Sequence, residues 1–567
     1  MQTVNSDKVY SPVIGVIADT SQYDVIREFF ELFKTPWEFY RTGRRYEVLL
    51  CAGDIQFDPS ARLVLVYAGG RTRFDGEGKT PSALTGDRKY LVAHQGYRLP
   101  VYGDAVTFPG EASGLLTDAR SGESAAFVDL CKDRKLVRIG YDLFGEVRRL
   151  LDAGQPAVNA DLPALEMHIA FLRDLITGCG VPLLEIPPVP EGYRFIACLS
   201  HDIDHPSIRR HGWDRTTFGF LRRAVLGSMF NLLRRRLGIR DLLRNWVTAL
   251  KLPFVQLGLA EDFWLDFPDR YLKVEQGFRS TYFVIPFKNR PGKNVGRPRA
   301  SFRAARYGAQ DIAGIMQKLQ AAGCEIALHG IDAWVDEVRG REELQEISRL
   351  TLAPELGVRM HWLCFDRQSP SAIESAGAAY DSTVGYNETV GYRAGTTQVY
   401  KPLNADRLLE LPLHVMDTAM FYPPYLGLSP AQAKTRLEQM ADNVSRFGGC
   451  LTINWHDRSL APERLWGEVY RDLLEDLKKR GAWLGPAGQI VAWFRKRRSA
   501  VFEFDETGPF AVRTKVETKH IDGLPGLRLR IYNSRDPEEA GGARSADYVD
   551  AVVEEGVENP VPCRPRA

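Results

Sequence analysis

Long apolar runs, paired cysteines and an excess of either charge are all missing from this chain of 567 residues. No apolar stretch approaches the roughly 18 residues that a membrane span requires, and the N-terminus lacks a basic start followed by an apolar segment, so we expect no secretory signal. The eight cysteines include no CxxC pair, which argues against a disulfide framework or a structural zinc site and favours reduced thiols in the cytoplasm. The formal net charge of +2 is too small to predict nucleic-acid binding by the whole molecule.

Residues 1–185 are predicted to form an α/β domain of their own. The hydrophobic content of 44% and the charged content of 26% are typical of a soluble globular protein. This region contains no tight cluster of histidine, cysteine or acidic side chains, so we assign it no chemistry. A proline-rich stretch, residues 186–192, marks the boundary to the next domain. Strand-like or helical patterns occupy residues 13–18, 23–33, 46–51 and 63–67.

Residues 193–498 show strand-like and helical patterns in alternation. This alternation is typical of β/α units around a mostly parallel sheet or barrel. Beyond them, alternating polarity predicts a small β module over residues 499–567. Its acidic, Gly/Pro-containing tail, from residue 534 onward, is expected to be poorly ordered.

The segment Cys198–His205, with the sequence CLSHDIDH, is the most informative part of the chain. It places Asp202 and Asp204 at the end of an apolar run that we interpret as a buried strand. Side chains alternate along a strand, so both carboxylates are expected on the same side at its mouth. One could hold a metal ion while the other accepts a proton from metal-bound water. The alternative interpretation is a polar turn after a core strand.

Three further predicted strands carry histidine or arginine where they end. In parallel β/α folds chemistry collects at the carboxyl ends of strands, so these side chains are expected to converge on the two aspartates. The residues are His329, Arg359, His361 and His456.

A three-ligand metal site with open positions is the expected result of that convergence. Asp204 and His329 are the first two predicted ligands. The third is either His361, which arrives from the next strand, or Asp332, which shares a face with His329 if a helix starts there. Imidazole ligands predict zinc, with cobalt or nickel as alternatives.

Catalytic roles follow from the same positions. Asp202 is predicted to be the general base, and Arg359 to pair with it and keep it ionised and oriented. His456 is predicted to be the general acid, with a pKa raised by its neighbour Asp457 or by Asp417.

Arg393, in the sequence GYRAG, and Trp362, beside His361, are predicted to bind substrate. For either of Arg359 and Arg393 the alternative is a purely structural ion pair.

The order of these motifs resembles that of the polysaccharide deacetylases, the family four carbohydrate esterases with a NodB-like homology domain. The similarity covers about residues 193–498. The motifs that carry it are LSHDIDH, STYFV, EIALHG, GVRMHWL, YDST, LELPL and LTINWHD.

The resemblance implies a distorted (β/α) barrel with fewer than eight strands and metal-dependent removal of an N- or O-acyl group from a sugar. The family's base and first ligand fall on Asp202 and Asp204. Its histidine ligand falls on His329, its arginine on Arg359 and its acid on His456.

Two positions depart from the family's pattern. A second histidine often follows the first by four residues, but this position is Ala333. Prolines commonly follow the arginine, whereas this chain has Met360 and His361. A relocated third ligand would explain both departures, and a weakened or absent metal is the alternative.

The segment of residues 207–251 is rich in arginine interleaved with apolar side chains. This composition fits amphipathic helices lying on an anionic membrane surface, which would place the active site over a lipid-linked sugar. The alternative is a solvated helical pair that covers the barrel. No nucleic-acid-binding motif accompanies the segment. Its arginines are residues 209, 210, 215, 222, 223, 234, 235, 236, 240 and 244.

Together these features predict a metal-dependent sugar N-deacetylase of envelope or exopolysaccharide synthesis, located in the cytoplasm or at the inner face of the membrane. A deformylase or amidase acting on a lipid-linked aminosugar would use the same machinery. The alternative of a different class is a glycan-binding protein on a decayed deacetylase scaffold. It predicts no tight metal binding, whereas the intact acid and base favour the enzyme.

Overall fold

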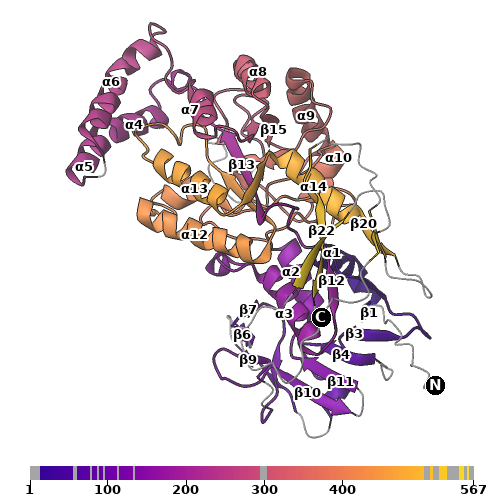
Figure 1. Ribbon diagram of the computed structural model, residues 1–567. Coiled ribbons are helices and arrows are strands. Elements are labelled where there is room, and N and C mark those ends of the chain that lie inside the picture. Colours follow the sequence, from indigo (N-terminus) through magenta and orange to yellow (C-terminus); the bar gives the residue numbers. More distant parts are fainter. Residues whose placement is uncertain are drawn as a thin grey trace. The chain divides into compact units, whose positions relative to one another are not determined.

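The chain folds into two compact units, which Figure 1 shows in a computed structural model. The first comprises Met1–Gly192, Ala394–Gln398 and Ala492–Ala567, and the second Tyr193–Arg393 and Val399–Val491. The structure describes residues 13–54, 61–76, 80–85, 89–93, 96–111, 114–131, 134–235, 237–293, 303–503, 511–514, 523–532, 548–553 and 559–560.

The first unit is built on a mostly parallel sheet in the strand order β10-β11-β4-β3-β1-β2. Its helix α1, Tyr23–Phe33, has the bounds that its apolar spacing predicts and ends at Lys34 in the left-handed conformation, with φ 47°. The other helices are α2 (Leu143–Asp152) and α3 (Ala164–Gly178). The strands of this sheet are β1 (Ile14–Ile17), β2 (Trp37–Phe39), β3 (Tyr46–Ala52), β4 (Ala61–Tyr67), β10 (Ala126–Cys131) and β11 (Arg134–Ile139). Smaller sheets contain β5 (Ser82–Ala83), β6 (Lys89–Ala93), β7 (Arg98–Val101), β8 (Val106–Thr107) and β9 (Leu116–Asp118).

The C-terminal strands pair partly with a strand that comes much earlier in the chain. Strand β22 (Leu527–Tyr532) pairs with β12 (Leu183–Glu185), which precedes the barrel in the chain. On its other side it pairs with β23 (Tyr548–Val553). Most of the acidic tail, for which the sequence predicts poor order, lies outside the described residues. Asp550 Oδ1 lies 2.8 Å from Arg530 Nε, and this ion pair supports the register of β22 and β23. A separate three-stranded sheet joins β20 (Ala500–Glu503), β21 (Ala511–Thr514) and β24 (Asn559–Pro560).

Among the described residues of the second unit, seven parallel strands form one curled sheet, in the order β16-β15-β14-β13-β18-β17, with β19 also pairing with β13. Central β13 is buried along its whole length, and it reads in the sequence as one apolar run with polar residues near its end. The strands are β13 (Phe195–Ile203), β14 (Thr281–Val284), β15 (Glu325–Gly330), β16 (Val358–Met360), β17 (Val415–Met416), β18 (Cys450–Asn454) and β19 (Ala482–Gly485). This is the predicted mixed α/β architecture, with a curled parallel half-barrel.

Helices connect these strands and cover the sheet. Helices α12 and α13 lie side by side in both ribbon views. The helices after the arm described below are α7 (Phe267–Val274), α8 (Ala313–Ala321), α9 (Glu337–Thr351), α10 (Ser369–Ala376), α11 (Asp417–Phe421), α12 (Pro430–Phe447), α13 (Gly467–Lys479) and α14 (Ala487–Ser499).

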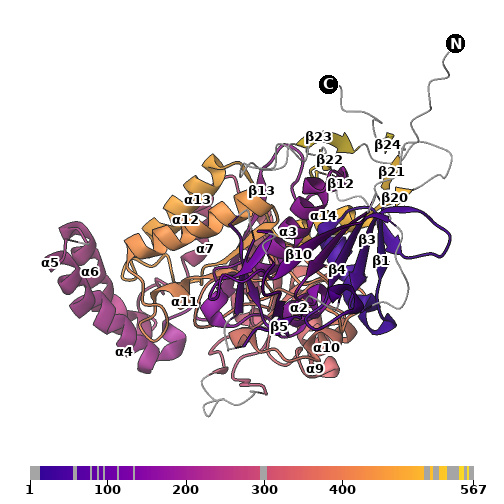
Figure 2. The same ribbon diagram turned by 90° about the horizontal axis from the view of Figure 1, so that it is seen from below.

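A helical arm follows β13 and projects away from the sheet (Figures 1 and 2). It consists of α4 (Arg215–Leu221), a π-helical turn (Arg222–Gly227), α5 (Ser228–Leu233) and α6 (Ile239–Gln256). Its inner side is held by a small core that includes Phe220, Leu252 and Trp264. No helix in the described part of the chain combines the length and the apolar composition needed to cross a bilayer.

Candidate active site

Strand β13 carries Asp202, whose carboxylate is fixed by partners from two other strands. Asp202 is only 3% exposed. Its Oδ1 accepts a hydrogen bond from Arg359 Nη1 at 3.0 Å, and its Oδ2 accepts one from Asn454 Nδ2 at 2.7 Å. Burial would raise its pKa, but His329, Arg359 and His456 outweigh that effect and lower the pKa. The carboxylate is therefore ionised near neutral pH and held in one orientation.

Arg359, the middle residue of β16, is itself fully buried and held by several acceptors. Its Nη1 also donates to Ser200 Oγ at 2.8 Å, while its Nε and Nη2 donate to the carbonyl and hydroxyl of Ser382. Ser200 and Asp202 share a face of β13 because they are two residues apart. His201 lies between them on the opposite face, where it packs against aromatic rings.

Asp204, His329 and His361 form a compact group of candidate metal ligands, with one atom from each within 4.8 Å of the others. Asp204 Oδ1 lies 3.4 Å from His329 Nε2 and 3.6 Å from His361 Nε2. This oxygen is buried, yet it accepts no hydrogen bond from any described residue. Two ligands of one tetrahedral zinc ion, each about 2.1 Å from it, are about 3.4 Å apart. The spacing and the oxygen–nitrogen donor set therefore fit a divalent ion such as zinc, cobalt or nickel.

The surroundings of the two histidines in this group leave a ring nitrogen of each free to bind a metal ion. His329 Nδ1 lies 2.9 Å from the carbonyl oxygen of Arg359. When Nδ1–H donates to that carbonyl, the lone pair of Nε2 is left facing Asp204. Burial lowers the pKa of His361 to about 3, so its imidazole is neutral at physiological pH, as metal binding requires.

Asp332, the other candidate for the third ligand, lies outside this group. Its Oδ2 accepts a hydrogen bond from Arg339 Nη1 at 2.8 Å, and its Oδ1 accepts one from the backbone N–H of Lys293 at 2.7 Å. Ala333, where the family often has a histidine, is 1% exposed and packs against helix α9. The geometry thus offers His361 as the third ligand.

His456 follows β18 and is held by Asp417, the first residue of α11. Its Nδ1 is 2.6 Å from Asp417 Oδ1, and its backbone N–H donates to Oδ2 of the same carboxylate at 2.8 Å. Burial would lower the pKa of His456, but the charge and hydrogen bond of Asp417 outweigh it and raise the pKa to about 10. His456 Nε2, which lies 3.7 Å from Asp204 Oδ2, therefore carries a proton near neutral pH.

The group opens to solvent on the side of Asp204 and His456. Their side chains are 17% and 12% exposed, whereas the side chain of His329 is 2% exposed. A substrate can therefore approach from the side where an acid and a ligand are both accessible.

Of the two predicted substrate-binding residues, Trp362 lies beside the candidate ligand His361, whereas Arg393 is hydrogen-bonded elsewhere. Trp362 follows His361, with ring centroids 5.9 Å apart, and both it and Leu363 have positive φ values of 64° and 49°. Two successive non-glycine residues in this conformation are strained, and such strain collects at functional sites. Arg393 Nη1 donates to the Gly385 carbonyl at 2.8 Å. It forms no hydrogen bond or ion pair with the Asp204 group in the described part of the chain.

Sequence reasoning missed three residues that hold Asp202 and Arg359 in place. Asn454, Ser200 and Ser382 are all buried and all contribute hydrogen bonds around Asp202 or Arg359. A signal for Asn454 was present, because an amide at the end of the buried strand β18 must find buried partners.

No family model and no curated protein match this chain. Among solved structures, it is similar to a protein described as a polysaccharide deacetylase from Mycobacterium smegmatis, with 18% identity over 55% of this chain and 94% of that one, and a TM-score of 0.34. It is similar to the carbohydrate deacetylase Agd3, with 9% identity over 92% of this chain and 91% of that one, and a TM-score of 0.33. It is also similar to the Puue allantoinase, with 16% identity over 54% of this chain and 92% of that one, and a TM-score of 0.32. Two of these three structures are described as polysaccharide or carbohydrate deacetylases.

Proposed function

We propose that the protein is a metal-dependent hydrolase that removes an N-acetyl group from a sugar of a glycan or of a lipid-linked saccharide. One observation carries this proposal: an ionised carboxylate, Asp202, and a protonated imidazole, His456, both adjoin the candidate metal group. Hydrolysis requires a base and an acid at one place, whereas binding alone requires neither.

Asp204, His329 and His361 would hold the ion through one carboxylate oxygen and two Nε2 atoms. A divalent ion bound there supplies Lewis acidity, which polarises the acyl oxygen and lowers the pKa of water. Asp202, fixed and ionised, accepts a proton from the attacking water. His456 delivers its Nε2 proton to the leaving nitrogen, while Asp417 keeps the ring oriented.

Acetate release and metal content test this proposal together. Protein supplied with zinc, cobalt or nickel should bind about one ion per chain and release acetate from N-acetylated saccharides. We expect Asp204→Ala, His329→Ala and His361→Ala to lose the ion. Asp332→Ala is the matched control and should keep it, because its carboxylate is held outside the metal group.

Asp202→Asn and His456→Gln should retain the metal and lose the activity, because they remove the base and the acid and leave the ligands intact. Release of formate instead of acetate would identify a deformylase. A wild-type protein that stays metal-free after supplementation would contradict the hydrolase and favour a glycan-binding role.

We also propose that the segment of residues 207–251 contacts an anionic membrane surface, at the cytoplasmic face where a lipid-linked sugar would be presented. Its helices expose large apolar side chains to an unusual degree, among them Leu226 at 60%, Leu233 at 76% and Leu250 at 75%. Arginines are interleaved with them along the same helices, which supports an anionic partner over a neutral one. Arg236 lies outside the described residues.

A further inference from the structure

Three arginines near His456 have no carboxylate partner in the described part of the chain. Arg458 and Arg464 lie in the loop that follows His456, and Arg223 lies in the π-helical turn of the arm. None of their side-chain nitrogens lies within 4.0 Å of a described carboxylate oxygen. The Nε atoms of Arg223 and Arg464 are buried and have no hydrogen-bond partner among the described residues. Arg464 is only 6% exposed, so its unpaired charge is costly to bury.

The three positive charges act on one another. Burial, followed by the charges of Arg464 and Arg458, lowers the pKa of Arg223 to about 10. Burial and Arg464 likewise lower the pKa of Arg458. Burial would lower the pKa of Arg464, but Tyr422, Glu463 and Asp417 outweigh it and raise the pKa. The repulsion that remains on Arg223 and Arg458 would be relieved by a bound counter-charge.

The protein's own acidic groups neutralise the positive charge of the three arginines only in part. Arg464 Nη1 donates to the Tyr422 hydroxyl at 3.1 Å. Burial raises the pKa of Tyr422, but Arg464 and Arg458 outweigh it and lower the pKa to about 8, so the phenol is mostly neutral near pH 7. The Glu463 carboxylate lies near Arg223 and Arg464 without pairing with either, and its Oε1 has no hydrogen-bond partner among the described residues.

Aromatic rings hold two of the guanidinium groups in place. The Cζ atom of Arg464 lies 4.7 Å from the ring centroid of Trp466, and that of Arg458 lies 5.4 Å from the ring centroid of Trp264. These contacts restrict the side chains and leave their N–H edges available to an acceptor. The arrangement is that of a preorganised anion site beside the catalytic acid.

We propose that Arg223, Arg458 and Arg464 bind a phosphate ester group of the substrate. Phosphate carries up to two charges and three terminal acceptor oxygens, which matches three guanidinium forks better than a carboxylate does. The inference rests on the proposed hydrolase in that the phosphate belongs to the molecule being deacylated. It narrows the substrate to a phosphorylated saccharide, either soluble or attached to a lipid.

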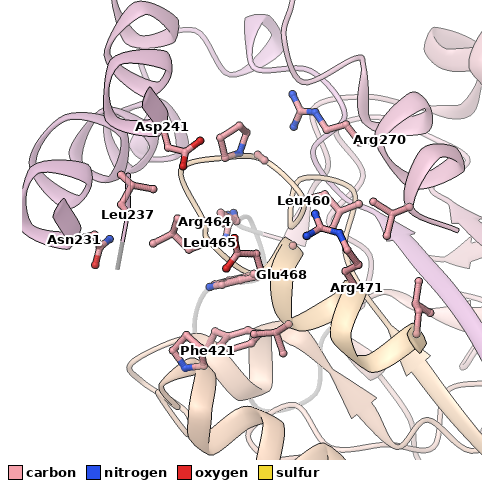
Figure 3. A pocket seen from close by; sticks show the side chains of 18 of the residues that line it. Asn231, Leu237, Asp241, Arg270, Phe421, Leu460, Arg464, Leu465, Glu468 and Arg471 are labelled. Carbon is pink, nitrogen blue, oxygen red and sulfur yellow. The ribbon is translucent and has the colours of Figure 1, made fainter. Parts of the chain in front are cut away.

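Of the three arginines, Arg464 lines a cavity of about 1400 Å³ between the arm and the α11–α13 region. In Figure 3, Asn231, Leu237 and Asp241 of the arm line one part of this cavity, and Phe421, Arg464 and Arg471 line another. Its lining contains more basic than acidic residues: Arg235, Arg244, Arg270, Lys273, Arg464, Arg471 and Lys478 against Asp241, Glu468 and Glu475. There is therefore room beside the arginine site for whatever the phosphate is attached to.

Binding of inorganic phosphate to metal-free, full-length protein tests the site directly. We expect phosphate to raise the Tm in a saturable way, relative to chloride at equal ionic strength. The shift should persist in Asp204→Ala, because the site does not use the metal. Arg223→Met and Arg464→Met should weaken the apparent phosphate affinity by about tenfold or more, since each loses charge-assisted hydrogen bonds. Arg471→Met, also in the cavity lining, is the matched control and should bind phosphate like the wild type.

The Tm measured without phosphate distinguishes a phosphate-binding role of Arg223 from a purely structural one. Relief of repulsion should leave the Tm of Arg223→Met unchanged or higher, whereas loss of a structural ion pair would lower it. A wild type without a phosphate response, or an undiminished response in both Arg223→Met and Arg464→Met, would overturn the proposal.

Two further probes identify the source of the phosphate. Tighter binding of N-acetylglucosamine 1-phosphate than of phosphate would indicate a soluble substrate. Tighter binding of dodecyl phosphate in detergent micelles would indicate a lipid-linked substrate. Either result would support the site. Failure of the hydrolase would appear as no acyl release with phosphate binding intact. Failure of this inference would leave acyl release from neutral saccharides unaffected.

Discussion

At the scale of single residues, the contact between Asp417 and His456 sets the protonation state of the proposed acid. Asp417 is fully buried, and its Oδ1 lies 2.6 Å from Nδ1 of His456. The carboxylate favours the charged imidazole, so His456 stays protonated up to a pH of about 10 and loses its proton as the pH rises further.

Asp417→Asn should therefore lower kcat by roughly 10²-fold or more and move the alkaline limb of the kcat profile to lower pH. Without the negative charge the pKa of His456 falls, so the proton that the reaction needs is lost earlier as the pH rises. The measurement is kcat for acyl release as a function of pH in the metal-loaded variant. An alkaline limb that stays where it is in the wild type would contradict this role of Asp417.

The candidate site also shows which residues a sequence can and cannot identify. Asp202, Asp204, His329 and His456 each lie at a strand end that apolar periodicity reveals. The choice between His361 and Asp332 depends on where a helix begins, and no local signal fixes that. In the structure helix α9 begins only at Glu337, so Asp332 does not share a helical face with His329.

At the scale of elements, strands and helices with strong apolar periodicity were predictable, whereas strand partners were not. Helix α1 begins and ends where its spacing predicts. The pairing of β22 with β12 could not be foreseen, because more than 300 residues of sequence separate the two and alternating polarity does not specify a partner. The arginine site was missed for the same reason, since Arg223 comes from the arm and the other two arginines from the loop after β18.

The helical arm should bind anionic vesicles through its exposed leucines. Leu250→Gln combined with Leu257→Gln should reduce cosedimentation with vesicles that contain phosphatidylserine, because both side chains are more than 70% exposed and available to insert. The free energy of unfolding should change by less than about 1 kcal/mol, since neither leucine is part of a core.

Leu352→Gln is the matched control for the arm, because Leu352 is 88% exposed but lies at the end of α9. It should leave vesicle binding unchanged. Equal loss in this control, or self-association through the same leucines without vesicle binding, would contradict a membrane contact and favour a second copy as the partner.

At the scale of the whole molecule, the chain consists of two units with separate cores, and all the candidate ligands belong to the second unit. A ligand stabilises only the unit whose folded form it binds. Binding of metal and of phosphate should therefore stabilise the second unit and leave the stability of the first unit unchanged.

We accordingly expect thermal unfolding in two transitions, of which zinc raises only one. At a free zinc concentration of 100 times the Kd, the gain is about 2.7 kcal/mol. Differential scanning calorimetry with zinc and then with chelator checks this. Asp204→Ala should abolish the shift and Asp332→Ala should retain it, whereas a zinc shift of both transitions would show that the two units unfold together.

The strand order of the curled sheet also bears on how the protein is made. Central β13 pairs with β18, and Ser200 donates a hydrogen bond to Ile453 across 253 positions of sequence. During synthesis Asp204, His329 and His361 all leave the ribosome before His456, so a nascent chain can gather its metal ligands while the catalytic acid is still missing. Because closing so distant a pair is entropically slow, we expect β18 to join the sheet late in folding. A nascent chain is therefore expected to be able to hold the proposed metal before the proposed acid, His456, is in place.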